Sequence, residues 1–321
     1  MKKRSQIENK YKWDLTKFCE NDETWYKKLE TVKPEINKIS EFKGKLNNPD
    51  ELLKYYKLLE SLEMSLSKLS MYANNNLNTD LSNSVYIEMN NILDTVVVQT
   101  IAASSYFAPE MLSYDNTYFE QLITSPQFSD HVFAHKKLLR SKEHVLTEKE
   151  ENLLSLSLNF AGEFSSVYRA LTDVELKFDD IKDSNDKVLK LDQNNYSSYL
   201  INKDRTIRLN AFNNIQLGFK KFVNTISSNY IASLKADWFY AKCKNFNSVL
   251  EESLFPDNVN LKVYEKLVTN INSNLSLLQN FFKLKAKALK IKDFSYCDMY
   301  LPLSNNTKKI TYENAFEVLC K

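Results

Sequence analysis

Apolar residues recur at intervals of three and four along most of the chain, which is the period of an amphipathic α-helix. The clearest series lies in residues 51–73 and consists of Leu52, Tyr55, Tyr56, Leu59, Leu62, Leu66, Leu69 and Ala73. An asparagine-rich break (74–80) follows, and then a second apolar series from Val85 to Val97. We therefore predict a long helical hairpin, in which Asp80 caps the second helix and that helix ends near Pro109.

The helical period returns further along the chain. Residues 131–170 predict two helices that meet near 144–147, with Asp130 as the cap of the first helix. Thr147 and Glu150 have the spacing of a capping box at the start of the second. Beyond residue 203 two helical blocks are predicted on either side of the segment 255–260; their apolar positions are Ile215, Phe219, Phe222, Ile226, Leu267, Ile271, Leu275, Leu278 and Phe282.

Residues 176–191 are the stretch that predicts β-strands. Leu176 and Phe178 alternate with charged residues, the sequence DSND favours a turn, and apolar residues resume at Val188. The chain is therefore predicted to be mostly α-helical with one small β-hairpin, which we interpret as a boundary between lobes.

Composition excludes several classes of function. The 321 residues contain 3 glycines, where average usage of about 7% would give roughly 22. No GxGxxG, GxxxxGK[ST] or GxSxG sequence occurs, which argues against dinucleotide and P-loop nucleotide sites and against a nucleophile elbow. A net charge of +2 gives no argument for a nucleic-acid partner.

The N-terminal segment, the cysteines and the uncharged runs bear on the location of the protein. The basic start of the chain lacks the apolar stretch of a secretory signal, and the uncharged run at 95–109 is too short and polar to span a bilayer. Cys19, Cys243, Cys297 and Cys320 are far apart in sequence. We therefore expect a soluble cytoplasmic protein with unpaired thiols and no membrane partner.

The segment HVFAH (131–135) has the spacing of two zinc ligands, because residues four apart lie on one face of a helix. In an HExxH motif a glutamate next to the first histidine supplies the base. Here Val132 occupies that position, and the remaining histidine, His144, lies nine residues away across a predicted helix junction. We interpret His131 and His135 as structural residues rather than metal ligands.

Other reactive side chains also favour a structural interpretation. Neighbouring carboxylates, Glu150 with Glu151 and Asp179 with Asp180, point to different faces and are predicted to be solvated charges. The cysteines have no histidine nearby and are predicted to be core thiols. The segment YKWDLTKF (11–18) is predicted to anchor the N-terminal segment by packing. The residues by themselves therefore predict no catalytic, cofactor-binding or metal-binding residue.

Nine stretches, in their order along the chain, resemble the oligoendopeptidase F family of thimet-oligopeptidase-like zinc metallopeptidases. They are YKWDL (11–15), FKGKL (42–46), APEML (108–112), RSKEHVLTEKEENLL (140–154), FDDIKDSNDK (178–187), DRTIRLNAF (204–212), NT (224–225) with AKCKNFNSVLEESL (241–254), YCDMYLPL (296–303) and ITYENAFEVL (310–319). Arg140 and His144 match recurrent positions, whereas Asp186 stands where the family often has glycine, a backbone position that Asp tolerates better than most residues. CKNF (243–246) also departs from the usual pattern.

This resemblance implies a division of the chain. Residues 1–200 would form a helical N-terminal lobe, with the core of the family's N-terminal domain at about 113–183. Residues 203–321 would form the first helices of an incomplete metallopeptidase domain. Because these helices would normally pack against further elements, we predict that 203–321 is less protected from hydrogen exchange than 1–200.

The implied function is zinc-dependent hydrolysis of internal bonds in short peptides. The family's HExxH helix lies beyond the equivalent of ITYENAFEVL, so no catalytic or metal-binding residue is carried over onto this sequence. The chain alone is predicted to be inactive and to bind no zinc, with short peptides and the missing C-terminal catalytic half as its partners. Two alternatives stay open: a non-catalytic binding module that complements a separate catalytic half, and an unrelated helical protein.

Overall fold

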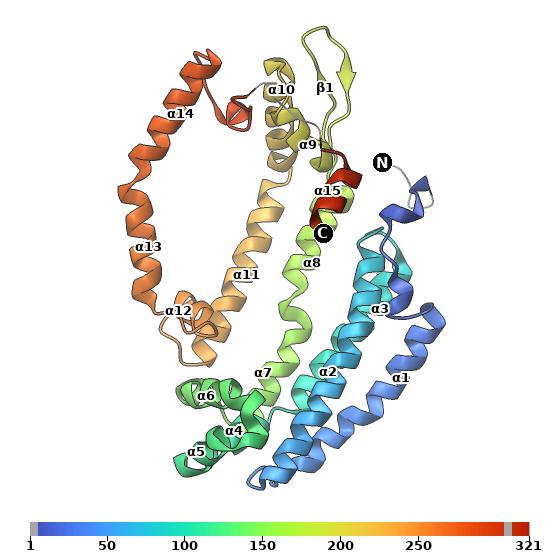
Figure 1. Ribbon diagram of the computed structural model, residues 1–321, viewed down its shortest axis with the longest axis vertical. Helices are drawn as coiled ribbons and strands as arrows, with labels where there is room; N and C mark the ends of the chain where they lie inside the picture. Colours follow the sequence, from blue (N-terminus) through green and yellow to red (C-terminus); the bar gives the residue numbers. More distant parts are fainter. Residues whose placement is uncertain (1–5, 305–309, 321) are drawn as a thin grey trace. The chain divides into compact units, whose positions relative to one another are not determined.

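The computed structural model describes residues 6–304 and 310–320. Helices dominate this part of the chain, and one two-stranded antiparallel sheet accompanies them (Figure 1). The predicted mostly α fold with a small hairpin is therefore confirmed. By packing, the chain divides into unit 1 (Met1–Glu175 and Ile226–Val259) and unit 2 (Leu176–Thr225 and Asn260–Lys321). The division at about 200–203 concerns the lobes of the family and stays a prediction.

The regular secondary structure in the described part of unit 1 consists of helices joined by turns and loops. Its α-helices are α1 (Asp22–Ile39), α2 (Pro49–Leu77), α3 (Ser84–Ala103), α4 (Phe107–Ser113), α5 (Asn116–Thr124), α6 (Val132–Arg140), α7 (Glu148–Ala161), α8 (Glu163–Arg169), most of α11 (Val223–Cys243) and α12 (Val249–Leu254). Short 3-10 segments lie at Asn9–Tyr11, Leu15–Lys17, Ser40–Phe42, Pro126–His131 and Lys142–His144, and a π-helical turn at Ala170–Glu175.

The predicted helical hairpin is α2 and α3, which pack against each other. Its details differ from the prediction. Helix α2 continues through the first asparagines to Leu77, and Asn83 rather than Asp80 caps α3, because the Asp80 carboxylate instead accepts from Ser82 within the connecting turn. Helix α3 ends at Ala103, and Pro109 lies in the first turn of α4, where its missing N–H costs nothing.

The core of unit 1 lies between α1, α2 and α3. Trp25 of α1 is fully buried, and its indole N–H donates to the carbonyl oxygen of Leu69 in α2 at 2.9 Å. The Tyr106 hydroxyl donates to the Ile39 carbonyl oxygen at 2.6 Å, and Tyr55 stacks on Phe107 with ring centroids 5.0 Å apart. Buried aromatic side chains therefore hold the helices together, both by packing and by hydrogen bonds from their N–H and O–H groups.

The two helices predicted in 131–170 are present as α6 and α7, and the chain turns between them at 141–147. The capping box of Thr147 and Glu150 is confirmed, whereas Asp130 does not cap α6. Asp130 lies inside the preceding 3-10 segment, and His131 occupies the cap position without a side-chain hydrogen bond. A further break at Gly162 separates α7 from α8.

Unit 2 contains the hairpin and five α-helices in its described part: β1 (Ile181–Lys182), β2 (Val188–Leu189), α9 (Gln193–Leu200), α10 (Arg205–Lys220), α13 (Leu261–Ser273), α14 (Leu275–Leu289) and α15 (Tyr312–Leu319), with a 3-10 turn at Tyr296–Asp298. Ile181 pairs with Leu189. In the turn, Asp186 has a φ of +60°, the left-handed conformation that favours glycine, as expected from its place in the family pattern.

The hairpin is fixed to α10 by close packing and by hydrogen bonds. A Cβ added at Gly218 of α10 would lie 2.5 Å from the Phe178 ring, so only glycine allows this approach. The Asn210 amide donates to the carbonyl oxygen of Lys182, and Asp204, which caps α10, accepts from the N–H of Ser184 in the turn. Within the described residues, no helix is long and apolar enough to cross a membrane.

Candidate functional site

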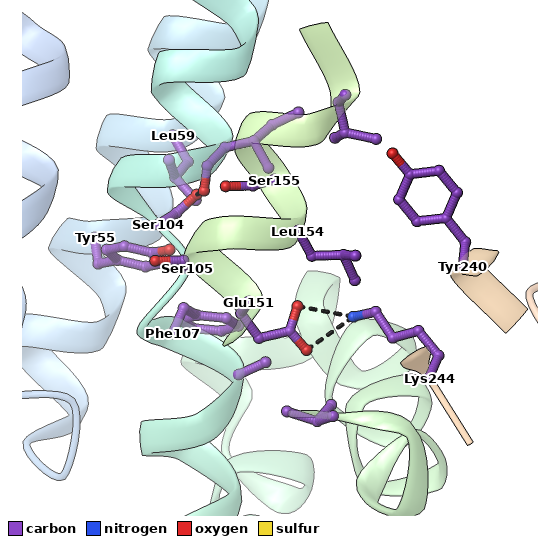
Figure 2. A pocket seen from close by; sticks show the side chains of 14 residues that line it. Tyr55, Leu59, Ser104, Ser105, Phe107, Glu151, Leu154, Ser155, Tyr240 and Lys244 are labelled. Atoms are coloured by element: carbon purple, nitrogen blue, oxygen red, sulfur yellow. Dashed lines mark hydrogen bonds and ion pairs between the residues drawn. The ribbon is translucent and has the colours of Figure 1, made fainter. Parts of the chain in front are cut away.

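The clearest polar site of unit 1 joins two stretches that are distant in sequence. Glu151 in α7 and Lys244, just after α11, form a bidentate ion pair with N–O distances of 2.7 and 2.8 Å (Figure 2). Both side chains are mostly covered, and Glu151 also accepts from the Leu146 N–H. Glu151 was predicted to be a solvated charge, and that prediction is wrong, because its partner comes from the other stretch.

His144 makes a second contact between the same stretches. Its ring lies flat on Phe246 with centroids 3.7 Å apart, and its Nδ1 is 2.8 Å from the Lys244 carbonyl oxygen, to which it donates. Helix α11 ends with Asn245 in the left-handed conformation, and Phe246 N–H donates back to the Ala241 carbonyl oxygen. This turn places the Phe246 ring under the imidazole.

Arg140 completes the contact. Its guanidinium donates to the Phe255 carbonyl oxygen at 2.9 Å and lies over the Phe255 ring, 4.8 Å from the centroid. The Phe255 ring in turn meets those of His144 and Phe246 edge-on. The stretches RSKEHVLTEKEENLL and AKCKNFNSVLEESL, singled out in the sequence, thus bind each other through His144 and Glu151, and Arg140 extends the contact to Phe255, the residue that follows the second stretch.

A pocket of about 450 Å³ opens beside this ion pair. Figure 2 shows Glu151 and Lys244 at one side of it and Tyr240 at another. Its lining is mostly apolar and comes from Tyr55, Leu59, Ile101, Ser104, Ser105, Phe107, Ala108, Val145, Glu151, Leu154, Ser155, Leu158, Tyr240 and Lys244. The Tyr240 hydroxyl forms a hydrogen bond with the Ser157 hydroxyl, with 2.6 Å between the two oxygen atoms.

The chemistry available in this pocket is limited. Its two charged groups, Glu151 and Lys244, satisfy each other, and no histidine lies among the lining residues to activate one of its serines as a nucleophile. The pocket can hold an apolar group, and the ion pair fixes α7 to the end of α11. Sequence reasoning did not find this site, because nothing local pairs Glu151 with Lys244.

His131 and His135 do lie on one side of their segment, as the spacing predicts, and both face Tyr56 of α2. The His131 ring stacks on Tyr56 at 4.4 Å, and His135 Nε2 is 2.9 Å from the Tyr56 hydroxyl. His135 is fully buried, and its burial, with a smaller effect of His131, lowers its pKa to about 4. The structural interpretation of these two histidines thus has a concrete basis in an aromatic cluster.

Zinc does not fit these residues. His144 is engaged with Phe246 and Lys244, away from Tyr56, and within residues 6–304 and 310–320 no three histidine, cysteine or acidic side chains gather as a metal would require. The described part of the chain therefore offers no site to which a metal-dependent step can be assigned.

In unit 2, two further stretches that resemble the family contact each other. Asp298, from YCDMYLPL, is fully buried and accepts from Arg208 at 2.7 Å and from Arg205 at 3.2 Å, both from DRTIRLNAF. Arg208 is itself buried and also donates to the carbonyl oxygens of Asn202 and Lys203. Burial by itself would raise the pKa of Asp298, but the hydrogen bonds from Arg208, Arg205 and Ser295 outweigh it and lower that pKa.

The remaining predictions have mixed outcomes. Cys19 and Cys297 are buried thiols as predicted, and burial raises the pKa of Cys19, whereas Cys243 is half-buried and Cys320 is exposed. In the N-terminal anchor Leu15 is buried and Phe18 packs against the core, whereas Trp13 is 85% exposed and does not contribute to the packing. Asp179 is exposed, as predicted for a solvated charge.

Comparison with known proteins shows what the stretches that make these contacts resemble. Residues 110–178, which include Arg140, His144 and Glu151, match the family model described as Oligopeptidase F. The chain is 30% identical to an oligoendopeptidase F homolog of Borreliella burgdorferi, over 99% of this chain and 52% of that protein. It is 29% identical to oligopeptidase PepF of Bacillus subtilis, over 99% of this chain and 48% of that protein.

Solved structures agree in fold. A putative peptidase from Chlamydophila abortus matches with a TM-score of 0.67 and 26% identity, over 98% of this chain and 53% of that one. The oligoendopeptidase-F of Enterococcus faecium matches with a TM-score of 0.80 at 23% identity, over 94% of this chain and 58% of that one. The chain spans about half the length of the relatives it matches. By sequence and fold the chain is similar to the N-terminal half of proteins named oligoendopeptidase F.

Proposed function

We propose that the chain is the N-terminal part of a zinc-dependent oligoendopeptidase that hydrolyses internal bonds of short peptides. The observation that carries the proposal is the match along 99% of the chain to proteins named as oligopeptidases. The contacts of His144 and Glu151, and that of Asp298 with Arg208, support it, because each joins two stretches that resemble the family. No catalytic residue is assigned to this chain.

In this proposal the metal ligands and the catalytic base lie outside the 321 residues. The chain alone then binds no catalytic zinc and cleaves no peptide. Its role is to supply one wall of the substrate cleft, with residues 1–200 as the N-terminal lobe and 203–321 as the start of the catalytic domain. The remaining half brings the reactive groups, and the complete enzyme works in the cytoplasm.

A second candidate function is a non-catalytic module that binds a peptide or a partner. The apolar pocket beside Glu151 and Lys244 favours it, because a mostly apolar pocket with a few polar groups is the usual form of a binding site. This module would complement a separately encoded catalytic half without contributing to the chemistry.

The test uses the protein from its own cells, captured with an antibody to residues 6–200. We expect the captured material to contain sequence of the family's remaining half, to carry one zinc ion and to cleave a short fluorogenic peptide in a chelator-sensitive manner. The purified 321-residue chain should show neither zinc nor cleavage. Stoichiometric zinc and chelator-sensitive cleavage by the purified chain would overturn the assignment of the active site to the other half. Captured material that cleaves no peptide would favour the binding module.

A further inference from the structure

Helices α13 and α14 carry a large apolar surface. The two helices follow each other end to end in unit 2 and meet at Asn274 (Figure 1). Their exposed large apolar side chains are Leu261, Val263, Tyr264, Leu267, Val268, Ile271, Leu275, Leu277, Leu278, Phe281 and Leu284. No residue from 261 to 284 is buried, and Leu267, Ile271 and Leu278 are each more than half exposed.

Five of these eleven side chains form one stripe. Tyr264, Leu267, Ile271, Leu275 and Leu278 are spaced by three or four residues, which keeps them on one face across the junction between the helices. We call these five residues the α13–α14 stripe. The end of α14 is anchored, because Phe282 meets Phe294 and the Lys285 ammonium donates to the Met299 carbonyl oxygen at 2.6 Å.

An exposed apolar surface of this size indicates a site that packs against another part of a protein. The largest apolar patch on a typical monomer is about 300–600 Å² and is often functional. The stripe and its neighbours comprise eleven large side chains, each about 40–65% exposed. Helices of 13 and 15 residues are also marginal in water without tertiary packing, so the stripe is the face through which α13 and α14 gain stability.

The charges beside the stripe argue against a second copy of the chain as its cover. Residues 261–292 contain seven lysines and one glutamate. Two copies facing each other through this region would bring like charges together, which costs free energy. A partner surface with an apolar centre and an acidic rim would complement it.

The length of the relatives identifies the occupant. They extend to about twice the matched length, so a comparable amount of polypeptide accompanies the matched half in each of them. The core around α1, α2 and α3 contains fully buried side chains, whereas α13 and α14 lack such a core. We propose that the α13–α14 stripe is the docking surface for the remaining half of an oligoendopeptidase F-type protein, with acidic residues of that half around the lysines. The inference rests on the proposed function and names the surface that function requires.

The experiment labels single cysteines in protein from its own cells. Leu267→Cys and Leu278→Cys are introduced separately, at the native locus and with Cys320→Ser to remove the exposed native thiol. Met64→Cys on α2 is the matched control, because Met64 is 61% exposed and Leu267 is 57% exposed. The rate of modification by a maleimide is measured in the captured assembly and in the purified 321-residue chain, and the composition of the assembly is determined by mass spectrometry.

We expect the assembly to contain the remaining half, as the same or as a second polypeptide, and both stripe cysteines to react at least tenfold more slowly there than in the purified chain. The Met64→Cys control should react equally in both. Three results would overturn the inference: equal labelling of the stripe in both forms, protection in an assembly that holds only copies of this chain, and protection already present in the purified monomer. Peptide cleavage by the same assembly is a separate readout, so that an active assembly with an unprotected stripe would reject the docking surface and retain the proposed function.

Discussion

The imidazole of His144 lies flat on the ring of Phe246, with 3.7 Å between centroids, and its Nδ1 donates to the carbonyl oxygen of Lys244. The two residues belong to stretches that are a hundred positions apart and that each resemble the same family. Their contact explains why a histidine stands at this position without binding a metal. It joins the turn between α6 and α7 to the end of α11.

Replacement of His144 should therefore weaken the contact between this turn and the end of α11, and so destabilise unit 1. His144→Ala removes the stacking and the hydrogen bond, and we expect a loss of about 2–3 kcal/mol in the free energy of unfolding of unit 1. His144→Phe keeps a ring on Phe246 and should lose only about 1 kcal/mol. Urea unfolding followed by tryptophan fluorescence measures both changes, and an equal loss in the two variants would contradict the assigned stacking.

Asp298 should be the most sensitive single position of unit 2. Asp298→Ala leaves the buried Arg208 without its carboxylate, and we expect a loss of about 3–5 kcal/mol, since an uncompensated buried charge remains. Asp293→Ala, which removes a nearby carboxylate that the pair does not use, is the control and should change stability by less than about 0.5 kcal/mol. Hydrogen exchange of α10, resolved by mass spectrometry, reports the effect on this unit.

We expect the free energy of unfolding to decrease at acid pH because His135 is buried in its neutral form. Its pKa is lowered to about 4 in the fold by burial and, to a smaller extent, by His131, whereas an unfolded histidine titrates near 6.5. Above pH 6.5 both states are neutral and the stability is fully present. As the pH falls from 6.5 toward 4 the unfolded state takes up a proton that the folded state does not, and stability falls by up to about 3 kcal/mol.

A variant isolates this contribution. His135→Phe has no proton to take up, so its free energy of unfolding should change less between pH 7 and pH 4.5 than that of the wild type. Denaturant titrations at both pH values give the difference. A pH dependence that is identical in the two proteins would assign the acid sensitivity to other groups.

Two glycines offer a matched pair. A methyl group at Gly218 would meet the Phe178 ring at 2.5 Å, and we expect Gly218→Ala to destabilise unit 2 by about 1–3 kcal/mol. Gly162, between α7 and α8, has nothing within 4 Å of an added Cβ and a helical backbone, so Gly162→Ala should stabilise by about 0.5–1 kcal/mol. Thermal unfolding by circular dichroism should show melting temperatures that shift in opposite directions.

Hydrogen exchange tests the division of stability along the chain. We expect amides in α13 and α14 to exchange much faster than those in α2 and α3, because residues 261–284 include no buried side chain while α2 and α3 share a core. The experiment uses the purified 321-residue chain at neutral pH. Equal protection of the two helix pairs would contradict the prediction that 203–321 is the less protected part.

Local sequence determined much of this protein. The three- and four-residue period fixes the helices, because it is the geometry of the helix itself that places those residues on one face. The capping box of Thr147 and Glu150 and the short hairpin near 181–189 also follow from residues a few positions apart. The boundaries at Asp80, Pro109 and Asp130 were wrong, since each side chain found a different local partner or position from the one its type favours.

The tertiary structure alone decided the charged and aromatic contacts. Glu151 looked like a solvated carboxylate until Lys244 was brought to it, and Asp298 had no visible role before α10 placed Arg208 against it. Trp13 and Cys320 are apolar by type and still exposed. A pattern of period 3.6 states which face of a helix is apolar, but the partner of that face depends on the path of the chain in space. Neither the Glu151–Lys244 pair nor the exposure of the α13–α14 stripe can therefore be read from residues close in sequence.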